Sequence, residues 1–372
     1  MTTRVKSTSS GSPAIASTHR DVFEQMAVYA HEQVSFWYDP ESGYRGIIAI
    51  HNTALGPALG GTRFWKYTND AEALFDVLRL ARGMTYKAAV AGLDLGGGKS
   101  VIIGDNKTKQ REGIFRAHGR HVESLAGRYI TAEDVGTGTR DMEYIREETT
   151  HVVGLAERSG DPSPVTAWGT YRGMQACAKY RYGSESLDGK TVAVQGVGHV
   201  GYYLCEYLHK DGAKLIVTDI DPQRVKRVVD DFGAKAVASD EIYTQKADIF
   251  APCALGAVVN DKTLDLLKVD VVAGAANNQL AEERHGDLLE ERGITYAPDY
   301  VINGGGLINV NTELQGWTLE QAHQKAGEIY DTILKVLEMA KEEGIPSYRA
   351  ADRLAEERVA AAEKRRGLPH RI

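Results

Sequence analysis

Two lysines and one aspartate in the first half of the chain have unusual surroundings for charged side chains. Lys87 stands in ARGMTYKAAVAG, Lys99 in LGGGKSV and Asp134 in TAEDVG, so most of their neighbours are small or apolar. Lysine has an ordinary pKa of about 10.4, and burial or a second nearby cation lowers it toward that of a useful base. If one cleft holds both lysines, one ammonium can pair with a substrate carboxylate while the other amine accepts a proton. These residues therefore predict acid–base chemistry on a small anionic substrate.

The glycine run before Lys99 superficially matches a phosphate-binding loop, whose pattern is G-x-x-x-x-G-K-[ST]. With Gly98 before the lysine, that pattern needs glycine at position 93, where this chain has Leu93. Residues 100–105 are a β-branched run that ends at a turn, which predicts a strand where a phosphate-binding loop needs a helix. The sequence therefore disfavours a nucleoside-triphosphate site. We expect the glycines to leave room for a ligand and for backbone close to Lys99.

A second glycine motif has the context of a dinucleotide site. Gly196, Gly198 and Gly201 form GxGxxG between an apolar strand at 191–195 and a helix predicted to end near residue 211. In such a unit the glycines permit a tight turn, approach of backbone to a pyrophosphate, and close packing of the helix, whose N-terminus faces the phosphates. Asp219 ends the next strand, where a carboxylate accepts hydrogen bonds from a ribose 2′-hydroxyl and repels a 2′-phosphate. NAD is therefore the predicted cofactor, bound by Gly196, Val197, Gly198, His199, Val200, Gly201 and Asp219.

The two groups of residues lie in halves of the chain with different patterns. The first half mixes predicted helices at 21–33, 70–83 and 111–126 with strands within 34–52, at 100–105 and at 128–132. The second half begins with a helix at 165–181 and then alternates short apolar strands with helices, which predicts a parallel sheet with right-handed crossovers. Its strands are predicted at 191–195, 214–219, 248–250, 269–272 and 295–297. Long helices follow at 319–343, begun by the capping box of Thr318 and Gln321, and at 348–365.

These patterns predict an α/β fold with two domains. The first, an α/β substrate-binding and oligomerisation domain, spans 1–151 and is joined by the C-terminal segment 341–372. The second spans 152–340 and is a doubly wound Rossmann domain that binds NAD. Residues 1–20 are rich in Ser and Thr and lack hydrophobic periodicity, which predicts a disordered tail.

Composition excludes several classes of partner. The 372 residues carry a net charge of −7 and contain no apolar run long enough to cross a membrane, and their short basic clusters are mixed with acids. Neither a membrane nor a nucleic acid is therefore a predicted partner. Three widely spaced cysteines favour a reducing compartment, so we predict a cytoplasmic protein. His118 and His121 lie three residues apart on a predicted helix, but no third ligand accompanies them, so we expect solvated histidines and no metal site.

Seven runs in order extend the motifs into a family resemblance. They are GPALGGTR (56–63), RGMTYK (82–87), GGGKS (96–100), TAEDVG (131–136), APCALG (251–256), AGAANN (273–278) and APDYVIN (297–303). Over residues 21–365 the chain resembles the glutamate/leucine/phenylalanine/valine dehydrogenase superfamily, and within it the leucine dehydrogenases most closely.

The resemblance implies reversible oxidative deamination of an L-amino acid to a 2-oxo acid and ammonia, with NAD reduced. By analogy, Lys87 holds the substrate α-carboxylate, and Lys99 is the general base that activates the attacking water. Asp134 relays protons to and from the amine. Thr166 and Asn277 contact the nicotinamide side of the cofactor. The resemblance also implies a homo-oligomer, which in this superfamily is often an octamer.

The side-chain pocket decides the substrate within this superfamily. Glutamate dehydrogenases carry a lysine where this chain has Leu59, and a substrate anion left unpaired against leucine would cost several kcal/mol. L-leucine, with valine and isoleucine, is therefore the predicted substrate class, while a phenylalanine dehydrogenase and a non-catalytic NAD-binding sensor stay open as alternatives. Leucine dehydrogenases commonly have valine at the position of Leu307, which leaves the rank order of substrates open. The resemblance places around the substrate Leu59, Gly60, Ala132, Leu307 and Val310.

Overall fold

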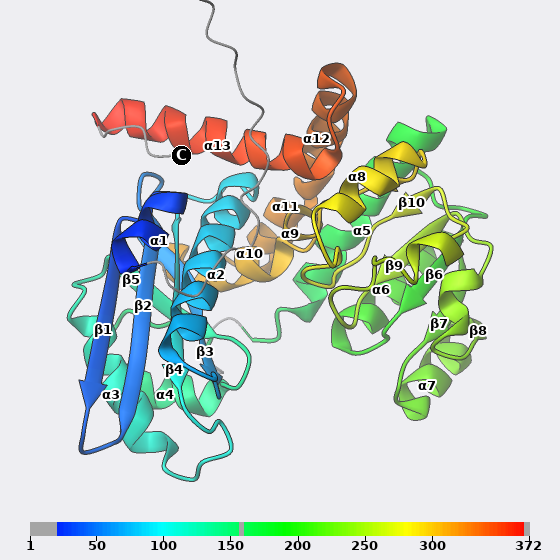
Figure 1. Cartoon of the computed structure of the whole chain (residues 1–372). Helices are drawn as coiled ribbons and strands as arrows, with labels where there is room; N and C mark the ends of the chain where they lie inside the picture. Colours follow the sequence, from blue (N-terminus) through cyan, green and yellow to red (C-terminus); the bar gives the residue numbers. More distant parts are fainter. Residues whose placement is uncertain (1–20, 156–159, 368–372) are drawn as a thin grey trace, which may run out of the picture.

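The computed structural model describes residues 21–155 and 160–367, and these residues contain two β-sheets that lie side by side (Figure 1). The first sheet is built from the first half of the chain and the second from the second half, as the α/β prediction requires. The predicted domain boundaries at 151 and 340 stay predictions. The predicted disordered tail at 1–20 lies outside the described residues.

The first sheet has five strands in the order β1-β2-β4-β3-β5. Strands β1 and β2 are antiparallel, β2 and β4 are antiparallel, and β3 runs parallel to both β4 and β5. Their bounds are Gln33–Asp39 (β1), Tyr44–Asn52 (β2), Ala58–Trp65 (β3), Gly96–Ile103 (β4) and Tyr129–Glu133 (β5). Strand β1 therefore lies at one edge, and its outer side pairs with no strand among the described residues.

Helices cover both faces of this sheet. Helix α2 (Asp70–Val90) buries Leu74, Val77 and Leu78 with side chains of β2 and β4 on one face. Helix α3 (Arg111–Glu123) packs on the opposite face. Asn69 caps the N-terminus of α2, because its side chain accepts a hydrogen bond from the Glu72 amide at 2.9 Å. The smaller helices of this half are α1 (Val22–Tyr29) and α4 (Thr139–Arg146).

The second sheet is parallel throughout and has the order β11-β10-β9-β6-β7-β8. Its strand order turns back between β6 and β9, which is the arrangement of a dinucleotide-binding sheet with its ligand site at that point. The strands are Thr191–Gln195 (β6), Lys214–Thr218 (β7), Lys235–Ala236 (β8), Ile249–Pro252 (β9), Val271–Val272 (β10) and Thr295–Tyr296 (β11). The helices around it are α6 (His199–Lys210), α7 (Pro222–Phe232) and α8 (Arg284–Glu291). The predicted Rossmann fold is confirmed.

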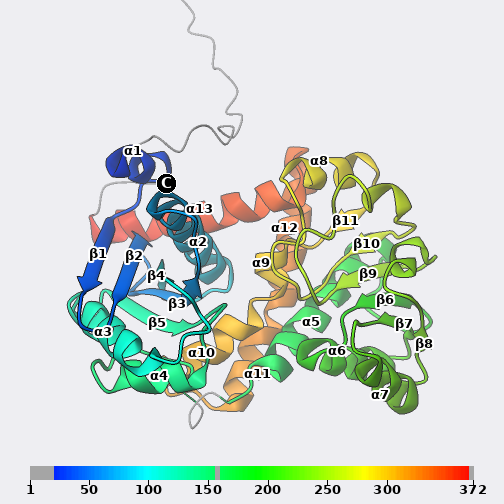
Figure 2. The same cartoon turned by 60° about the horizontal axis from the view of Figure 1, so that its bottom comes forward.

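The remaining helices connect the two halves (Figure 2). Helix α5 packs against α6, α10, α11 and α12, while the last helix, α13, packs against both α12 and α2. The C-terminal helix therefore returns to the first half, as predicted. The bounds are Ser163–Tyr182 (α5), Asp299–Ile302 (α9), Gly305–Gln315 (α10), Leu319–Gly327 (α11), Ile329–Glu343 (α12) and Ser347–Arg366 (α13).

Two predicted helices differ from the structure by more than a few residues. Helix α2 passes through the exposed Gly83 and ends only at Val90, because its second half is buried and this packing outweighs the roughly 1 kcal/mol that a helical glycine costs. The helix predicted at 319–343 is divided in two at Glu328. Near this break the Trp168 indole donates to the His323 carbonyl at 3.0 Å, and the Glu328 amide bonds three residues back.

The expectation for His118 and His121 is wrong. Both side chains are fully buried, and each ring is hydrogen-bonded to the Tyr44 hydroxyl through its Nδ1 atom. The distance is 2.8 Å for His118 and 3.0 Å for His121. They belong to a polar network that also includes Thr62 and Ser100 under the first sheet. Hydrophobic spacing alone did not reveal these histidines, because their polar partners come from strands distant in sequence.

Candidate active site

Strand β4 presents Lys99 to the face of the sheet that α2 covers. Gly97 and Val101 share this face because side chains alternate along a strand. A Cβ on Gly97 would lie 2.0 Å from the Thr85 amide nitrogen of α2, and one on Gly98 would lie 2.7 Å from the Tyr129 ring. The expected close approach of backbone is therefore confirmed at Gly97, and the space for a ligand stays a prediction. Gly97 lets α2 pack directly on the strand that carries Lys99, and Gly98, on the opposite face, lets the Tyr129 ring approach.

The Lys99 ammonium is buried beside Asp134. Its Nζ lies 3.1 Å from Asp134 Oδ2, and only 6% of the residue is exposed. Burial lowers the pKa of Lys99, Asp134 partly reverses that effect, and the charge of Arg63 lowers the pKa further. Burial works to raise the pKa of Asp134, but Lys99 and Arg63 together bring it below its usual value. The pair thus combines an amine that loses its proton more readily than an ordinary lysine with a carboxylate that ionises more readily than an ordinary aspartate.

Lys87 lies on the last turn of α2 and reaches the second half of the chain. Its Nζ donates to Asn303 Oδ1 at 2.7 Å, and Asn303 in turn donates to Asn277 Oδ1 at 2.7 Å. Burial lowers the pKa of Lys87 to about 8, an effect that Asp299 opposes and Lys99 reinforces. The charges of the two lysines are therefore close enough to influence each other, and Lys87 lies between the two halves.

The predicted side-chain pocket residues fall into one apolar cluster. Leu59 is 1% exposed and Leu307 is 7% exposed, and the partly buried Ala132 and Val310 pack against the same cluster. Gly60 is buried in β3, where a Cβ would lie 1.7 Å from the Gly98 carbonyl oxygen. These residues come from β3, β5 and α10, so both halves of the chain contribute apolar side chains to the cluster.

The glycine motif forms the turn that the sequence predicted. Gly196 has φ of +94°, and a Cβ there would lie 2.5 Å from Ala254. Gly198 is open, since the nearest atom to a Cβ would be Arg224 Nη1 at 3.6 Å. A Cβ on Gly201 would lie 2.1 Å from the Gly196 carbonyl oxygen. The first and third glycines thus close the turn, and the second leaves its backbone accessible.

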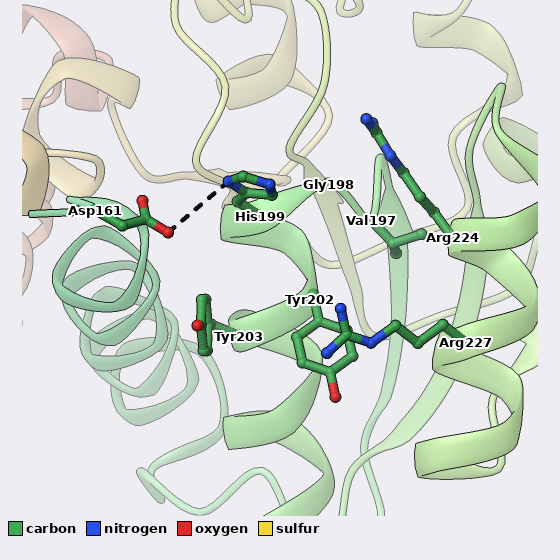
Figure 3. A pocket seen from close by; sticks show the side chains of 8 residues that line it. All are labelled: Asp161, Val197, Gly198, His199, Tyr202, Tyr203, Arg224 and Arg227. Carbon is green, nitrogen blue, oxygen red and sulfur yellow. Dashed lines mark ion pairs between the residues drawn. The ribbon is translucent and has the colours of Figure 1, made fainter. Parts of the chain in front are cut away.

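A hollow of about 400 Å³ opens beside this turn, at the N-terminus of α6 (Figure 3). Arg224 and Arg227 on α7 line it together with His199, whose Nδ1 lies 3.8 Å from Asp161 Oδ2. Accessible backbone at a helix N-terminus with two guanidinium groups fits the pyrophosphate of a dinucleotide. The full lining is Asp161, Val197, Gly198, His199, Tyr202, Tyr203, Arg224 and Arg227.

Three predicted cofactor residues have partners within the protein. Asp219 accepts hydrogen bonds from the amides of Val197 and Asp221, both at 2.9 Å, so its carboxylate ties the glycine turn to the end of β7. Thr166 is buried on α5 and donates to the Pro162 carbonyl. The exposed Asn277 accepts from Asn303, as described above. Their contacts with ribose and nicotinamide stay predictions.

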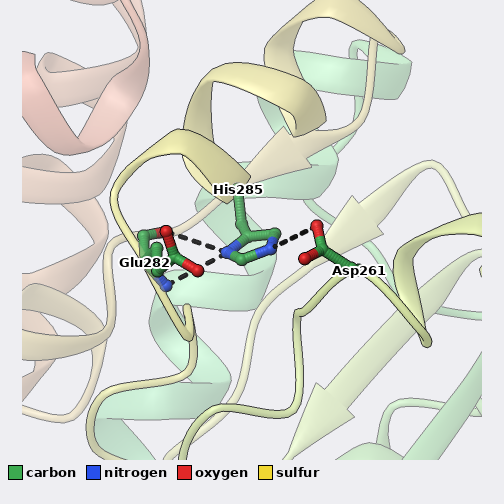
Figure 4. A group of neighbouring side chains, drawn as sticks. All are labelled: Asp261, Glu282 and His285. Atoms are coloured by element: carbon green, nitrogen blue, oxygen red, sulfur yellow. Dashed lines mark hydrogen bonds and ion pairs between the residues drawn. The ribbon is translucent and has the colours of Figure 1, made fainter.

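One other group of side chains has the donor types of a metal site (Figure 4). Asp261, Glu282 and His285 lie together, with His285 Nε2 3.2 Å from Asp261 Oδ1. However, Arg284 donates to both oxygens of Asp261 and to both of Glu282, at 2.6 to 3.1 Å. A guanidinium already provides the positive charge that these carboxylates require, and the group lies apart from Lys99 in the second half.

Sequence reasoning assigned no role to four residues around the lysines and Asp134. Three of them face Lys87 or Asp134 themselves, and the fourth, Asp76, is linked to Asp134 through Arg63. Arg63 and Asp76 lie in a chain of ion pairs with Asp134, while Asn303 and Asp299 face Lys87. Arg63 and Asn303 belong to runs that carried the family resemblance. Their position inside those runs was the available signal, because nothing in the spacing of Arg63 and Asp134 reveals that they meet.

Comparison with known proteins identifies the family. Residues 31–151 match the dimerisation domain of the Glu/Leu/Phe/Val dehydrogenases, and 159–225 with 217–367 match the Glutamate/Leucine/Phenylalanine/Valine dehydrogenase model. The chain belongs to this dehydrogenase family. It is 60% identical to a leucine dehydrogenase of Thermoactinomyces intermedius, over 93% of this chain and 95% of the relative, and 59% identical to that of Bacillus subtilis, over 91% and 94%. The crystal structure of L-tryptophan dehydrogenase from Nostoc punctiforme superposes with a TM-score of 0.86 and 46% identity, covering 92% of this chain and 99% of that one.

Membership of this dehydrogenase family confirms three predictions. The chain is an enzyme, it is an amino acid dehydrogenase, and its cofactor is NAD, for which the glycine turn and the hollow at α6 are suited. The alternative of a non-catalytic sensor is therefore set aside. No described helix is long and apolar enough to cross a membrane.

Proposed function

We propose that the enzyme catalyses reversible, NAD-dependent oxidative deamination of branched-chain L-amino acids, with L-leucine the principal substrate. The observation that carries this proposal is the buried contact between Lys99 and Asp134, with Lys87 nearby and Leu59 on the same face of the first sheet. The leucine dehydrogenase relatives support the substrate class.

Each charged residue has a distinct proposed role. Lys87 pairs with the substrate α-carboxylate, because its ammonium lies between the two halves and its one hydrogen-bond partner among the described residues is the neutral amide oxygen of Asn303. Lys99, as the neutral amine, takes a proton from the water that attacks the imine carbon. Asp134 accepts a proton from the substrate ammonium and later delivers one to the departing amine. Its contact with Lys99 lets protons pass between the two groups.

The proposed reaction balances in atoms and charge. The amino acid, water and oxidised NAD give the 2-oxo acid, ammonium, reduced NAD and one proton. NAD, when bound, supplies the acceptor for the hydride that leaves the substrate α-carbon. Thr166, Asn277 and Asp219, with the turn at 196–201, are the proposed contacts for it. Apolar walls exclude bulk water, so that the single water at Lys99 is the nucleophile.

The same apolar residues support selectivity for branched-chain substrates over glutamate. Leu59 and Leu307 are almost fully buried, and a γ-carboxylate placed against them would lose its hydration without gaining a cation. One methylene in an apolar pocket is worth only about 1–3 kcal/mol, so valine and isoleucine are expected to react as well. A phenylalanine dehydrogenase remains the second candidate, because a relative of this chain acts on an aromatic amino acid by its name.

A substrate survey tests this proposal. NADH absorbance is followed with leucine, valine, isoleucine, phenylalanine, tryptophan and glutamate, each with NAD and NADP. Leucine should give the highest kcat/KM and glutamate the lowest, and a preference for an aromatic substrate would favour the second candidate. Lys99→Ala should bind NADH normally, by fluorescence titration, yet lose activity. Substantial retained turnover would refute the role of Lys99 as the base.

We also propose that the enzyme is a cytoplasmic homo-oligomer, with the octamer as the expected assembly. The edge strand β1 supports an assembly because its outer side has no strand partner among the described residues and exposes Phe36 and Tyr38, at 54% and 66%. Light scattering of the wild type and of Phe36→Lys tests this, and a monomeric wild type would refute it. The three cysteines are free, which supports a reducing compartment.

A further inference from the structure

Asp134 is shared by two cations. Its Oδ2 lies 3.1 Å from Lys99 Nζ and 3.0 Å from Arg63 Nε, so one carboxylate oxygen contacts both. The other end of the Arg63 guanidinium lies 2.8 Å from Asp76 Oδ2 on α2. Arg63 and Asp76 are 21% and 16% exposed in their side chains. Four alternating charges therefore run from Lys99 through the sheet surface to α2.

The backbone is arranged to bring these groups together. Gly61 lies two residues before Arg63 on β3, on the same face, and a Cβ there would lie 2.3 Å from the Glu133 carbonyl oxygen and 2.9 Å from Asp134 Cβ. Glycine at this position thus allows Asp134 to approach β3. On α2, Asp76 also accepts a hydrogen bond from the Tyr67 hydroxyl at 2.8 Å, which fixes the carboxylate facing Arg63.

We propose that Arg63 is a positioning residue that holds Asp134 against Lys99 and is itself anchored by Asp76. The guanidinium also partly neutralises the Asp134 carboxylate, so that the carboxylate stabilises the ammonium form of Lys99 less. This inference rests on the proposed role of Lys99 as the base. A guanidinium suits the task because it is permanently charged and binds two carboxylates in fixed directions.

The electrostatics of the pair agree with this geometry. A carboxylate alone beside a buried lysine would stabilise the ammonium form and weaken the base. Arg63 opposes this, because its positive charge lowers the pKa of Lys99 and also helps to keep Asp134 ionised. Removing that charge while leaving Asp134 in place should therefore raise the pH at which Lys99 becomes active.

The test is the pH dependence of kcat/KM for L-leucine in Arg63→Gln, measured from pH 7 to 11. Below the pKa of the base, kcat/KM falls tenfold per pH unit, so a rise of about one unit appears as a tenfold loss at pH 8 and recovery at pH 11. A merely structural defect would lower kcat/KM equally at every pH. Parallel profiles for Arg63→Gln and wild type would overturn the proposal.

Two further variants keep the test decisive. Arg79→Gln is the matched control, since Arg79 lies 3.0 Å from the other oxygen of Asp76 but is 46% exposed, and its profile should match wild type. If Arg63→Gln does not fold, Arg63→Lys replaces it: the charge stays, so the pH limb should not move, but the lost fork should lower kcat at least threefold. Wild-type kcat in Arg63→Lys would overturn the positioning role.

The failure of this inference can be separated from failure of the proposed function. An active Lys99→Ala enzyme would refute the assignment of the base itself. An inactive Lys99→Ala enzyme together with an unshifted profile in Arg63→Gln would overturn only the role of Arg63. NADH binding by fluorescence and thermal unfolding, measured on every variant, confirm that each compared protein is folded.

Discussion

Four buried histidines should make the stability of this enzyme steeply dependent on pH between 5 and 6. All four are at most 7% exposed, and burial lowers their pKa values well below 6.5. The pKa falls to about 4 for His31, about 3 for His51 and about 4 for His121, and that of His118 also lies well below its ordinary value. In the folded enzyme these rings are therefore neutral at pH 5.

The sign follows from proton uptake on unfolding. Below pH 6.5 the unfolded chain binds a proton on each histidine that the folded enzyme refuses, so stability is complete above 6.5 and falls as the pH falls toward 4. Two buried carboxyls act in the opposite direction, because burial raises the pKa of Asp352 to about 6 and also raises that of Asp299. Unfolding therefore takes up four protons on the histidines and releases one or two from the carboxyls, a net uptake of two to three protons. This uptake corresponds to a change in the free energy of unfolding of about 3–4 kcal/mol per pH unit.

Urea unfolding at pH 5.0, 5.5, 6.0 and 7.0 measures this slope directly. From pH 6.5 to 5 the expected loss is about 5–6 kcal/mol, which equals the whole stability of a protein at the low end of the usual range of about 5–15 kcal/mol. His121→Gln removes one titrating ring and should reduce the slope by about 1.4 kcal/mol per pH unit. His209→Gln changes an exposed ring and should leave it unaltered. If the wild-type slope corresponds to the uptake of less than one proton, about 1.4 kcal/mol per pH unit, these histidines are not held neutral by burial.

Three substitutions test separate parts of the structure. Gly97→Ala should lower the free energy of unfolding, measured in urea, by about 3 kcal/mol, because the new Cβ meets the backbone of α2 at 2.0 Å. Gly83→Ala, which has open space and a helical backbone, should raise the free energy of unfolding by about 0.5–1 kcal/mol. Equal effects of the two substitutions would contradict this packing. Arg358→Met should lower the free energy of unfolding by about 2–3 kcal/mol, since Arg358 donates to three backbone carbonyls. Arg353→Met loses a surface ion pair with Glu343 and should leave the free energy of unfolding nearly unchanged. Similar losses in the two variants would refute the distinction. Lys87→Met should raise the KM for leucine at least a hundredfold and leave NADH binding unchanged, and an unaltered KM would exclude a carboxylate contact.

Local patterns predicted the second half of the chain well. The strand at 191–195, the glycine turn and α6 follow each other within about twenty residues, and each forms for reasons contained in that stretch. The parallel sheet then follows from alternation and handedness alone. The same reasoning did not give bounds for α7, α8 and α10, although Val225, Val228, Val229 and Phe232 of α7 have the spacing of one helix face.

Contacts between distant residues set the limit of prediction. Arg63 and Asp134 are 71 residues apart, and Lys87 and Asn303 are 216 apart, so no periodicity or motif spacing joins them. Side-chain chemistry still indicated which residues to watch, since Lys99 and Asp134 do meet. The sequence did not reveal Arg63 and Asp76, the third and fourth charged residues of the row that begins at Lys99, or the close packing of α2 on Gly97.

The position of the last helix determines when this enzyme can first become active during its synthesis. Sheet strands of the second half are complete once residue 296 has been made, so that half can begin to fold while the ribosome is still at work. The carbonyl groups just beyond Lys87 must wait longer, because their donor, Arg358, follows Ala88 by 270 residues. A nascent chain can therefore form the second sheet before the end of α2 is fastened, and the surroundings of Lys87 are complete only after Arg358 has been made.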